Sequence, residues 1–167
     1  MNDMNFKQAL PWYLLALVVI ILDQLTKHWA VADLQLYRPV EVTSFFNLTL
    51  AYNPGAAFSF LADAGGWQRW FFAGLSAAVS VALVIWISKL KRAERLLAIS
   101  LGLVLGGAVG NLYDRVVLGQ VVDFLDFHWQ GSHFPAFNIA DSAISIGAVL
   151  LVWETLFGKS AKEPAND

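Results

Sequence analysis

The sequence predicts an all-α polytopic membrane protein with four transmembrane helices, a small extracytoplasmic β element and a surface-lying loop. Of its 167 residues, 57% are hydrophobic and only 14% are charged, which is too apolar for a soluble domain of this length. A helix needs roughly 20 mostly apolar residues to cross a hydrocarbon core of about 30 Å. The predicted spans are residues 10–30, 68–88, 96–116 and 137–157 of a single membrane domain, 1–167.

The first and last spans carry charges at specific places. Asp23 and Lys27 lie one helical turn apart on one face of the first span, and Asp141 and Glu154 lie in the last. An alternative is that the first span is a cleaved signal peptide, since AVA (30–32) resembles a cleavage site. A retained helix explains more, because a signal peptide has no use for a paired aspartate and lysine.

The distribution of positive charge predicts the orientation. With a cytoplasmic N-terminus, seven of the eleven cationic residues lie on the cytoplasmic side, where lysine and arginine are enriched. They are Lys7, Lys89, Lys91, Arg92, Arg95, Lys159 and Lys162. Both termini are therefore predicted to be cytoplasmic, with a disordered tail at 158–167.

Two segments lie outside the membrane on the opposite side. Segment 32–66 contains VEVTSFFNLTLAYN, rich in β-branched and aromatic residues and followed by a turn signal, which predicts a short β element at the membrane surface. Segment 118–135 mixes aromatic residues with Asp123 and Asp126 and is predicted to be a surface-lying loop.

Polar residues of three spans reach the same depth. At the helical rise of 1.5 Å per residue, Asp23 lies about 20 Å from the inner end of its span and Asn111 about 22 Å from the inner end of its own. Asp141 lies about 6 Å inside the outer end of the last span. Ionisable residues within spans are energetically costly and usually mark function, so we predict that the functional site lies at this depth.

Two interpretations of this cluster remain open. One is a structural network in which Asp23 pairs with Lys27 and Asp114 pairs with Arg115. The other is a pair of carboxylates that share a proton, because the acidic residues at this depth outnumber the available cations. Two carboxylates that share a site hold one proton between them, and the pKa of one rises. Such a pair acts as general acid and base.

A carboxylate pair can hydrolyse a peptide bond without a covalent intermediate. One carboxylate removes a proton from the attacking water while its protonated partner polarises the carbonyl oxygen. The positive end of a helix dipole favours the ionised form of Asp141, so Asp141 is assigned as the base.

Other chemistries fit less well. The chain has no cysteine, which excludes disulfides and thiolate chemistry, and no basic surface suggests nucleic acid. GLSA (74–77) resembles a serine-protease elbow but lacks a histidine at its depth, so helix packing is expected there, as for the glycines of LGLVLGGAVGN (101–111). His128 and His133 in a loop are a weak metal-site alternative. We expect no metal and no cofactor.

Five blocks in the chain resemble the motif blocks of bacterial lipoprotein signal peptidase, the type II or prolipoprotein signal peptidase, an aspartic peptidase family. They occur in the family's order and cover nearly the whole chain. The blocks are DQLTK (23–27), YNPGAAFSF (52–60), GGAVGNLYDR (106–115), VVDFLDF (121–127) and FNIADSAISIG (137–147).

The resemblance implies an aspartic endopeptidase of the bacterial cytoplasmic (inner) membrane, with its active site at the outer, periplasmic face. Its substrates would be prolipoproteins, cut on the N-terminal side of a diacylglyceryl-modified cysteine, and globomycin-type cyclic peptides would inhibit it. By motif position, Asp123 and Asp141 are the catalytic pair. The implied substrate-binding or supporting residues are Asp23, Lys27, Asn53, Gly55, Asn111, Asp114, Arg115, Asn138 and Ala140.

Membrane lipid is the other expected partner. The periplasmic segments 32–66 and 118–135 are predicted to clamp the substrate's acyl chains, with Phe45 and Phe46 contributing. Two rival functions are a proton-coupled carrier or channel subunit, which needs polar groups across the whole membrane, and a non-catalytic assembly factor that binds helices through its glycine faces.

Overall fold

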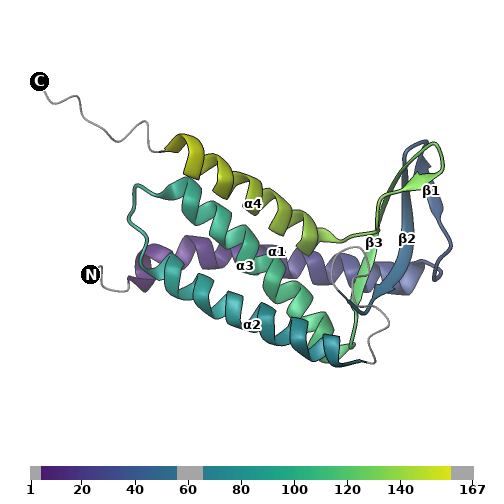
Figure 1. Ribbon diagram of the computed structural model, residues 1–167, viewed down its shortest axis with the longest axis horizontal. Helices are drawn as coiled ribbons and strands as arrows, with labels where there is room; N and C mark the ends of the chain where they lie inside the picture. Colours follow the sequence, from purple (N-terminus) through teal and green to yellow (C-terminus); the bar gives the residue numbers. More distant parts are fainter. Residues whose placement is uncertain (1–4, 56–65, 159–167) are drawn as a thin grey trace, which may run out of the picture.

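Four long helices and a four-stranded sheet make up the described part of the chain (Figure 1). The computed structural model describes residues 5–55 and 66–158. Its helices are α1 (Phe6–Asp33), α2 (Trp67–Ser88), α3 (Arg95–Val117) and α4 (Ile139–Phe157). Each is long and apolar enough to cross a membrane, so the predicted class of an α-helical polytopic membrane protein is confirmed.

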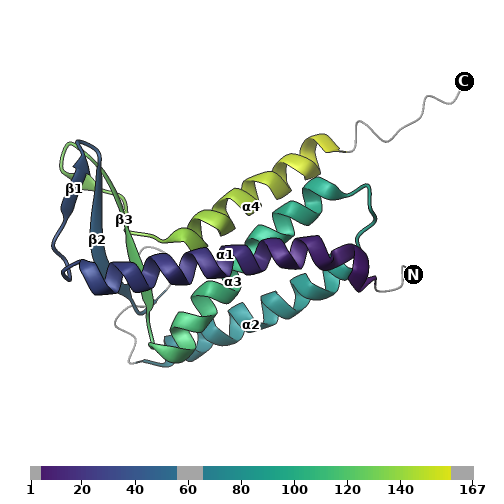
Figure 2. The same ribbon diagram turned by 180° about the vertical axis from the view of Figure 1, so that it is seen from behind.

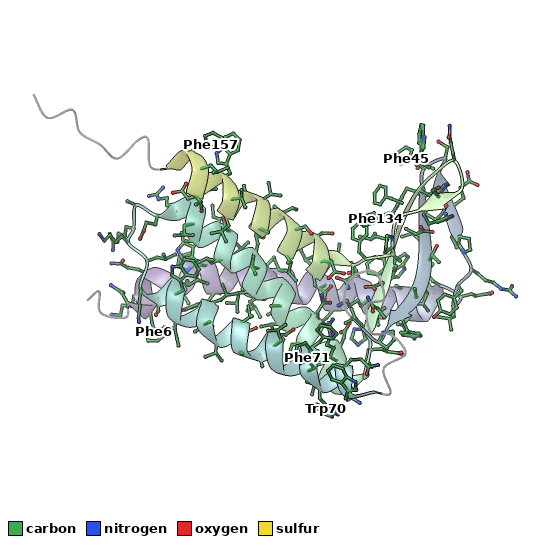
Figure 3. The ribbon with its side chains drawn as sticks, in the orientation of Figure 1. Phe6, Phe45, Trp70, Phe71, Phe134 and Phe157 are labelled. Carbon is green, nitrogen blue, oxygen red and sulfur yellow. The ribbon has the colours of Figure 1, made fainter. Side chains whose placement is uncertain are left out.

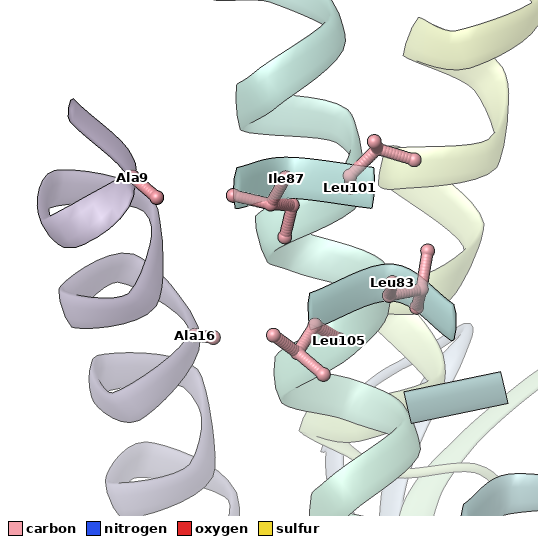
Figure 4. Close-up of a cluster of buried hydrophobic side chains, with 6 residues drawn as sticks. All are labelled: Ala9, Ala16, Leu83, Ile87, Leu101 and Leu105. Atoms are coloured by element: carbon pink, nitrogen blue, oxygen red, sulfur yellow. The ribbon is translucent and has the colours of Figure 1, made fainter. Parts of the chain in front are cut away.

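Helix α3 lies at the centre of the bundle and packs against the other three helices (Figures 1 and 2). Its glycines allow this close contact. A Cβ atom on Gly106 would lie 2.7 Å from the Cβ of Val19 and 2.8 Å from the carbonyl oxygen of Ala16. The predicted packing role of this glycine is therefore confirmed. An apolar cluster from α1, α2 and α3 fills the bundle toward the end opposite the sheet (Figure 4): Ala9, Ala16, Leu83, Ile87, Leu101 and Leu105.

The outward faces of the helices are apolar. Leu14 on α1, Val81 on α2 and Val149 on α4 are all more than half exposed. In water these side chains would favour burial, but within a bilayer they face lipid tails of similar polarity. The surface therefore agrees with a membrane location.

The sheet contains β1 (Val40–Thr43), β2 (Phe46–Asn53), β3 (Val121–Trp129) and β4 (Ser132–His133), paired antiparallel in that order. The predicted β element within 32–66 is confirmed. The loop prediction for 118–135 is wrong over β3 and β4, because side-chain hydrogen bonds satisfy the aspartates that interrupt the hydrophobic pattern: Thr49 of β2 donates to Asp126, and Asn138, the N-cap of α4, donates to Asp123.

Helices α1 and α4 meet the sheet in different ways. Helix α1 continues to Asp33, and its Trp29 makes an edge-to-face contact with Phe124 of β3 at 6.4 Å between ring centroids. Helix α4 begins only at Ile139, because Phe137 forms a β-bridge with Leu125. The sheet is thus held across one end of the bundle.

Candidate active site

A cavity of about 440 Å³ lies where the helices meet the sheet. Both predicted catalytic aspartates line it, Asp123 from β3 and Asp141 from the first turn of α4. Three other predicted residues share the lining: Asn53, Asn111 and Arg115. Figure 3 shows the polar side chains gathered in this region between the helix ends and the sheet.

Asp123 is held inside the sheet. It pairs in register with Ala51 of β2 and is only 2% exposed. Its Oδ1 accepts a hydrogen bond from Asn138 Nδ2 at 2.7 Å. Burial, and after it the negative charge of Asp141, raise the pKa of Asp123 to about 7, although hydrogen bonds from Asn138 and Asn53 oppose this rise. Near neutral pH this carboxyl group is therefore protonated in a large fraction of molecules.

Asp141 is positioned by the start of α4. Its backbone N–H donates to Oδ1 of Asn138, the N-cap residue, at 2.8 Å. Its own Oδ1 accepts a hydrogen bond from Asn111 Nδ2 at 2.7 Å. The side chain is half-buried and opens onto the cavity.

Two asparagines connect the aspartates, and their amide orientations follow from their neighbours. The ammonium group of Lys27 has only donors, so the oxygen of Asn111 faces Lys27 Nζ at 2.9 Å and its NH₂ group faces Asp141. The Asp141 backbone N–H likewise requires the oxygen of Asn138, which turns the Asn138 NH₂ group toward Asp123. Each carboxylate thus receives an oriented donor.

Lys27 is the centre of a buried ion cluster. Its Nζ lies 2.8 Å from Asp23 Oδ2 and 2.8 Å from Asp114 Oδ2, and all three side chains are at most 2% exposed. Asp23 Oδ1 also accepts the backbone N–H of Ala140 at 2.9 Å, and Asp114 Oδ2 accepts that of Val122 at 3.1 Å. The cluster therefore joins α1, α3, α4 and β3 behind the cavity.

The predicted pairing of Asp114 with Arg115 is wrong, although that of Asp23 with Lys27 is confirmed. Arg115 lines the cavity and makes no ion pair among residues 5–55 and 66–158. Its guanidinium donates to the carbonyl oxygens of Asn111 and Gly55, each at 3.2 Å. The positive charge therefore stays available to the cavity.

Two predicted residues shape the site through their backbones. The Gly55 N–H donates to Asn53 Oδ1 at 3.0 Å, which holds the end of β2 in a turn. Ala140 is fully buried and lies behind the cavity wall, not in its lining. A Cβ atom on Gly107 would collide with the Ala140 carbonyl oxygen, so this glycine allows α3 and α4 to meet.

Sequence reasoning missed two residues at this end. Gln24 donates to Asp114 Oδ1 at 2.8 Å, and its place in DQLTK beside Asp23 was an available signal. Tyr37 lines the cavity with φ of +55° and is 65% exposed. No pattern predicted Tyr37, since a bulky side chain in the left-handed region is uncommon.

His128 and His133 lie in the sheet, away from the cavity lining. Their rings stack with centroids 5.0 Å apart, and His133 Nδ1 lies 2.8 Å from Asp126 Oδ1. Burial by itself raises the pKa of Asp126, but hydrogen bonds from His133, Thr49 and Asn47 outweigh it and leave the pKa below its usual value. Among the described residues, no group of three His, Cys, Asp or Glu side chains is placed to hold a metal ion.

The structure also corrects or disfavours two hypotheses for the spans. Gly74 of GLSA has open space where a Cβ would lie, so the expected packing role is wrong at this glycine. Ser80 and Ser100 donate to the carbonyl groups of Ser76 and Leu96 in their own helices. These hydroxyls satisfy their helices locally and do not extend a polar path across the membrane, which disfavours a proton carrier.

Fold and site together define an integral membrane protein with two carboxyl groups facing a cavity at one end of a four-helix bundle. The sequence model of the family described as "Signal peptidase (SPase) II" matches residues 15–157. The chain belongs to this peptidase family, and its activity is cleavage of the signal peptides of prolipoproteins.

Relatives are similar in sequence to this chain over nearly its full length. A lipoprotein signal peptidase of Teredinibacter turnerae is 59% identical, over 95% of this chain and 94% of the relative. One of Pseudomonas aeruginosa is 52% identical over 99% of each chain. A solved bacterial membrane enzyme, determined in meso at 2.3 Å, matches with a TM-score of 0.82 and 33% identity, over 100% of this chain and 99% of that one.

Proposed function

We propose that Asp123 and Asp141 are the catalytic pair of this peptidase. The observation that carries the proposal is that both carboxyl groups line one cavity while each receives a hydrogen bond from an oriented asparagine amide. A pKa of about 7 for Asp123 supports its role as the protonated partner. Asp141, at the N-terminus of α4, then serves as the base.

The reaction follows from these roles. Asp141 removes a proton from water as its oxygen attacks the scissile carbonyl carbon, and Asp123 donates its proton to the carbonyl oxygen. Asp141 next protonates the amide nitrogen, the C–N bond breaks, and Asp123 takes back a proton from the intermediate. The products are a carboxylic acid and an amine, and both aspartates return to their starting states.

The cleaved bond lies on the N-terminal side of a diacylglyceryl-modified cysteine in this proposal. A row of aromatic rings supports a clamp around the acyl chains. Phe45 stacks on Phe127 at 6.4 Å between centroids, Phe127 stacks on Phe137 at 5.9 Å, and Phe137 contacts Phe134 at 6.0 Å. Phe134 and Phe137 line the cavity, and Figure 3 shows Phe134 nearer to the helices than Phe45.

The clamp has its own test. Replacing both Phe45 and Phe46 by alanine should raise KM for a diacylglyceryl substrate more than for an unlipidated peptide of the same sequence. Equal losses for both substrates would overturn it. Globomycin-type cyclic peptides are expected to compete for the same cavity.

The site faces the periplasm in this proposal, with the single domain in the bacterial inner membrane and both termini in the cytoplasm. The basic residues Lys91, Arg92 and Arg95 at the bundle end opposite the sheet support it. Because the chain lacks cysteine, single Arg92→Cys and Ser132→Cys variants can be labelled in intact spheroplasts. An impermeant maleimide should modify only the Ser132→Cys variant, and the reverse result would invert the orientation.

The catalytic pair is tested by substitution. Asp123→Asn and Asp141→Asn should each abolish cleavage of a diacylglyceryl-modified prolipoprotein while retaining the wild-type melting temperature within a few degrees. Asp126→Asn is the matched control, because it lies on the same strand outside the cavity lining. Normal turnover in either of the first two variants would exclude the aspartic mechanism.

A further inference from the structure

A second cavity, of about 420 Å³, opens at the opposite end of the molecule from the aspartates. It lies between the first turns of α1 and the turn that joins α2 to α3, which Figures 1 and 2 place at the bundle end away from the sheet. The backbone N–H of Asn5 donates to the carbonyl oxygen of Ser88 at 2.8 Å and holds the two walls together. The cavity is thus a defined feature, separate from the candidate active site.

The cavity has a strong excess of positive charge. Lys7, Lys91, Arg92 and Arg95 line it, against a single acidic residue, Glu94. Four cations and one carboxylate leave an excess of three positive charges. The Glu94 carboxylate accepts the backbone N–H of Lys91 at 2.7 Å, and the four cations make no ion pair within the described part of the chain. Their charge is therefore available to an external anion.

The backbone adds to this charge. The N-terminus of α1 and that of α3 both border the cavity. The Asn5 side chain caps α1 by accepting the N–H of Gln8, whereas the side chain of Glu94, the N-cap of α3, makes no capping hydrogen bond. Free N–H groups at a helix N-terminus favour an anion, phosphate included. These groups reinforce the lysine and arginine side chains.

The other part of the lining is apolar. Pro11, Trp12, Ile87 and Leu90 form it, with Ile87 almost completely buried. Leu14, about one turn beyond Pro11 on α1, is 51% exposed on the lipid-facing surface. Tryptophan is typical of the membrane–water interface. A ligand that fits both parts carries an anionic group next to hydrocarbon.

We propose that this cavity binds the phosphate of an anionic phospholipid, with the glycerol and upper acyl chain against Pro11, Trp12 and Leu90. The group recognised is a phosphate ester, and a soluble compound such as glycerol 3-phosphate carries the same group. The apolar wall and the position at the end of the membrane spans favour the lipid as its source. The site is independent of the catalytic roles of Asp123 and Asp141.

Native mass spectrometry of the purified, delipidated protein tests the proposal. Phosphatidylglycerol and phosphatidylcholine with identical chains are added to the detergent micelles, and glycerol 3-phosphate is a separate arm. The wild type should prefer phosphatidylglycerol. The Lys91→Gln/Arg92→Gln/Arg95→Gln variant should lose on the order of fivefold in affinity per removed cation, because each Lys or Arg near anionic lipid contributes about 1 kcal/mol.

Two control variants keep the result interpretable. Lys91→Arg/Arg92→Lys/Arg95→Lys preserves the charges and should keep the preference, whereas Arg38→Gln removes an exposed cation at the sheet end and should leave lipid binding unchanged. The triple glutamine variant should still cleave prolipoprotein, which shows that it is folded. Equal binding of both lipids, or an unchanged preference in the glutamine variant, would overturn the site. Equal affinity for glycerol 3-phosphate would support the phosphate site and overturn the lipid as its source.

Discussion

Asn138 donates a 2.7 Å hydrogen bond to Asp123 while its oxygen caps the helix that carries Asp141. One side chain therefore sets the distance between the strand and the helix that supply the two carboxyl groups. It is completely buried, and its NH₂ group also lies 3.2 Å from the carbonyl oxygen of Val122 and from Oδ1 of Asn111. The position of the pair depends on this residue as much as on the aspartates.

Replacing Asn138 by alanine should reduce kcat by about 10²-fold, the scale expected when reacting groups are displaced by about 1 Å. Loss of the cap should also lower the free energy of unfolding by about 1 kcal/mol. Asn138→Ser is the matched control, because serine also caps helices but cannot reach both groups. It should recover stability and not activity, measured by SDS titration and single-turnover cleavage. Recovery of both would reduce Asn138 to a helix cap.

Replacing Lys27 by methionine should destabilise the protein by about 3–5 kcal/mol, because Asp23 and Asp114 would keep buried charges without their cation. Adding Asp23→Asn and Asp114→Asn to this variant should restore part of the loss, since those charges are then removed. The measurement is SDS-induced unfolding in mixed micelles. Lys7→Met is the control: this lysine is exposed, and the change should stay within about 0.5 kcal/mol. An equal loss in the triple variant would contradict the ion-cluster explanation.

Much of the fold was predictable because the thickness of a bilayer sets the length of each apolar run. The common depth of Asp23, Asn111 and Asp141 was predictable from helical rise alone, and the structure places all three at the sheet end of the bundle. The partner of Asp114 was not predictable. Neighbours in a helix do not face each other, so Arg115 turns to the cavity while Asp114 meets Lys27 from α1.

The sequence pattern also did not predict the strand β3. Alternation is the signal for a half-buried strand, but the first four residues of β3, Val121 to Phe124, are all buried. Asp123 is tolerated there because side chains distant in the sequence donate hydrogen bonds to it: Asn138, a residue 15 positions away, and Asn53. Such long-range satisfaction of a polar group leaves no local trace in a sequence.

The pKa of about 7 for Asp123 predicts how activity depends on pH. As the pH rises through about 7, Asp123 loses the proton that it donates to the carbonyl oxygen. Cleavage should therefore decline on the alkaline side of neutrality, measured as single-turnover rates from pH 5 to 9. A rate that stays constant to pH 9 would contradict the role of Asp123 as the acid.

Stability gives an independent measure of the same pKa. Because burial and the charge of Asp141 raise the pKa of Asp123 above its usual 3.8, the folded protein binds a proton that the unfolded chain releases. This contribution is fully present below about pH 4 and is lost as the pH rises to about 7. Asp123→Asn should remove that part of the pH dependence of unfolding, and an unchanged slope would contradict the raised pKa.

The contact between α3 and α4 predicts a selective effect of adding one methyl group. In Gly107→Ala the new Cβ would collide with the carbonyl oxygen of Ala140 and lie 2.7 Å from Cγ1 of Ile144. A backbone atom cannot rotate away, so α4 must shift and move Asp141 with it. We expect a loss of about 1–3 kcal/mol in unfolding free energy and a fall in kcat with little change in KM.

Gly74→Ala is the matched control, since this glycine also lies in a membrane-spanning helix but has open space at the Cβ position. Alanine there should be neutral or slightly stabilising, because glycine is the poorer helix former by about 1 kcal/mol. Both variants are compared by SDS-induced unfolding and by cleavage of the same prolipoprotein. If Gly107→Ala behaves like Gly74→Ala, α4 has room to move without loss of function, and the position of Asp141 does not depend on the contact between Gly107 and Ala140.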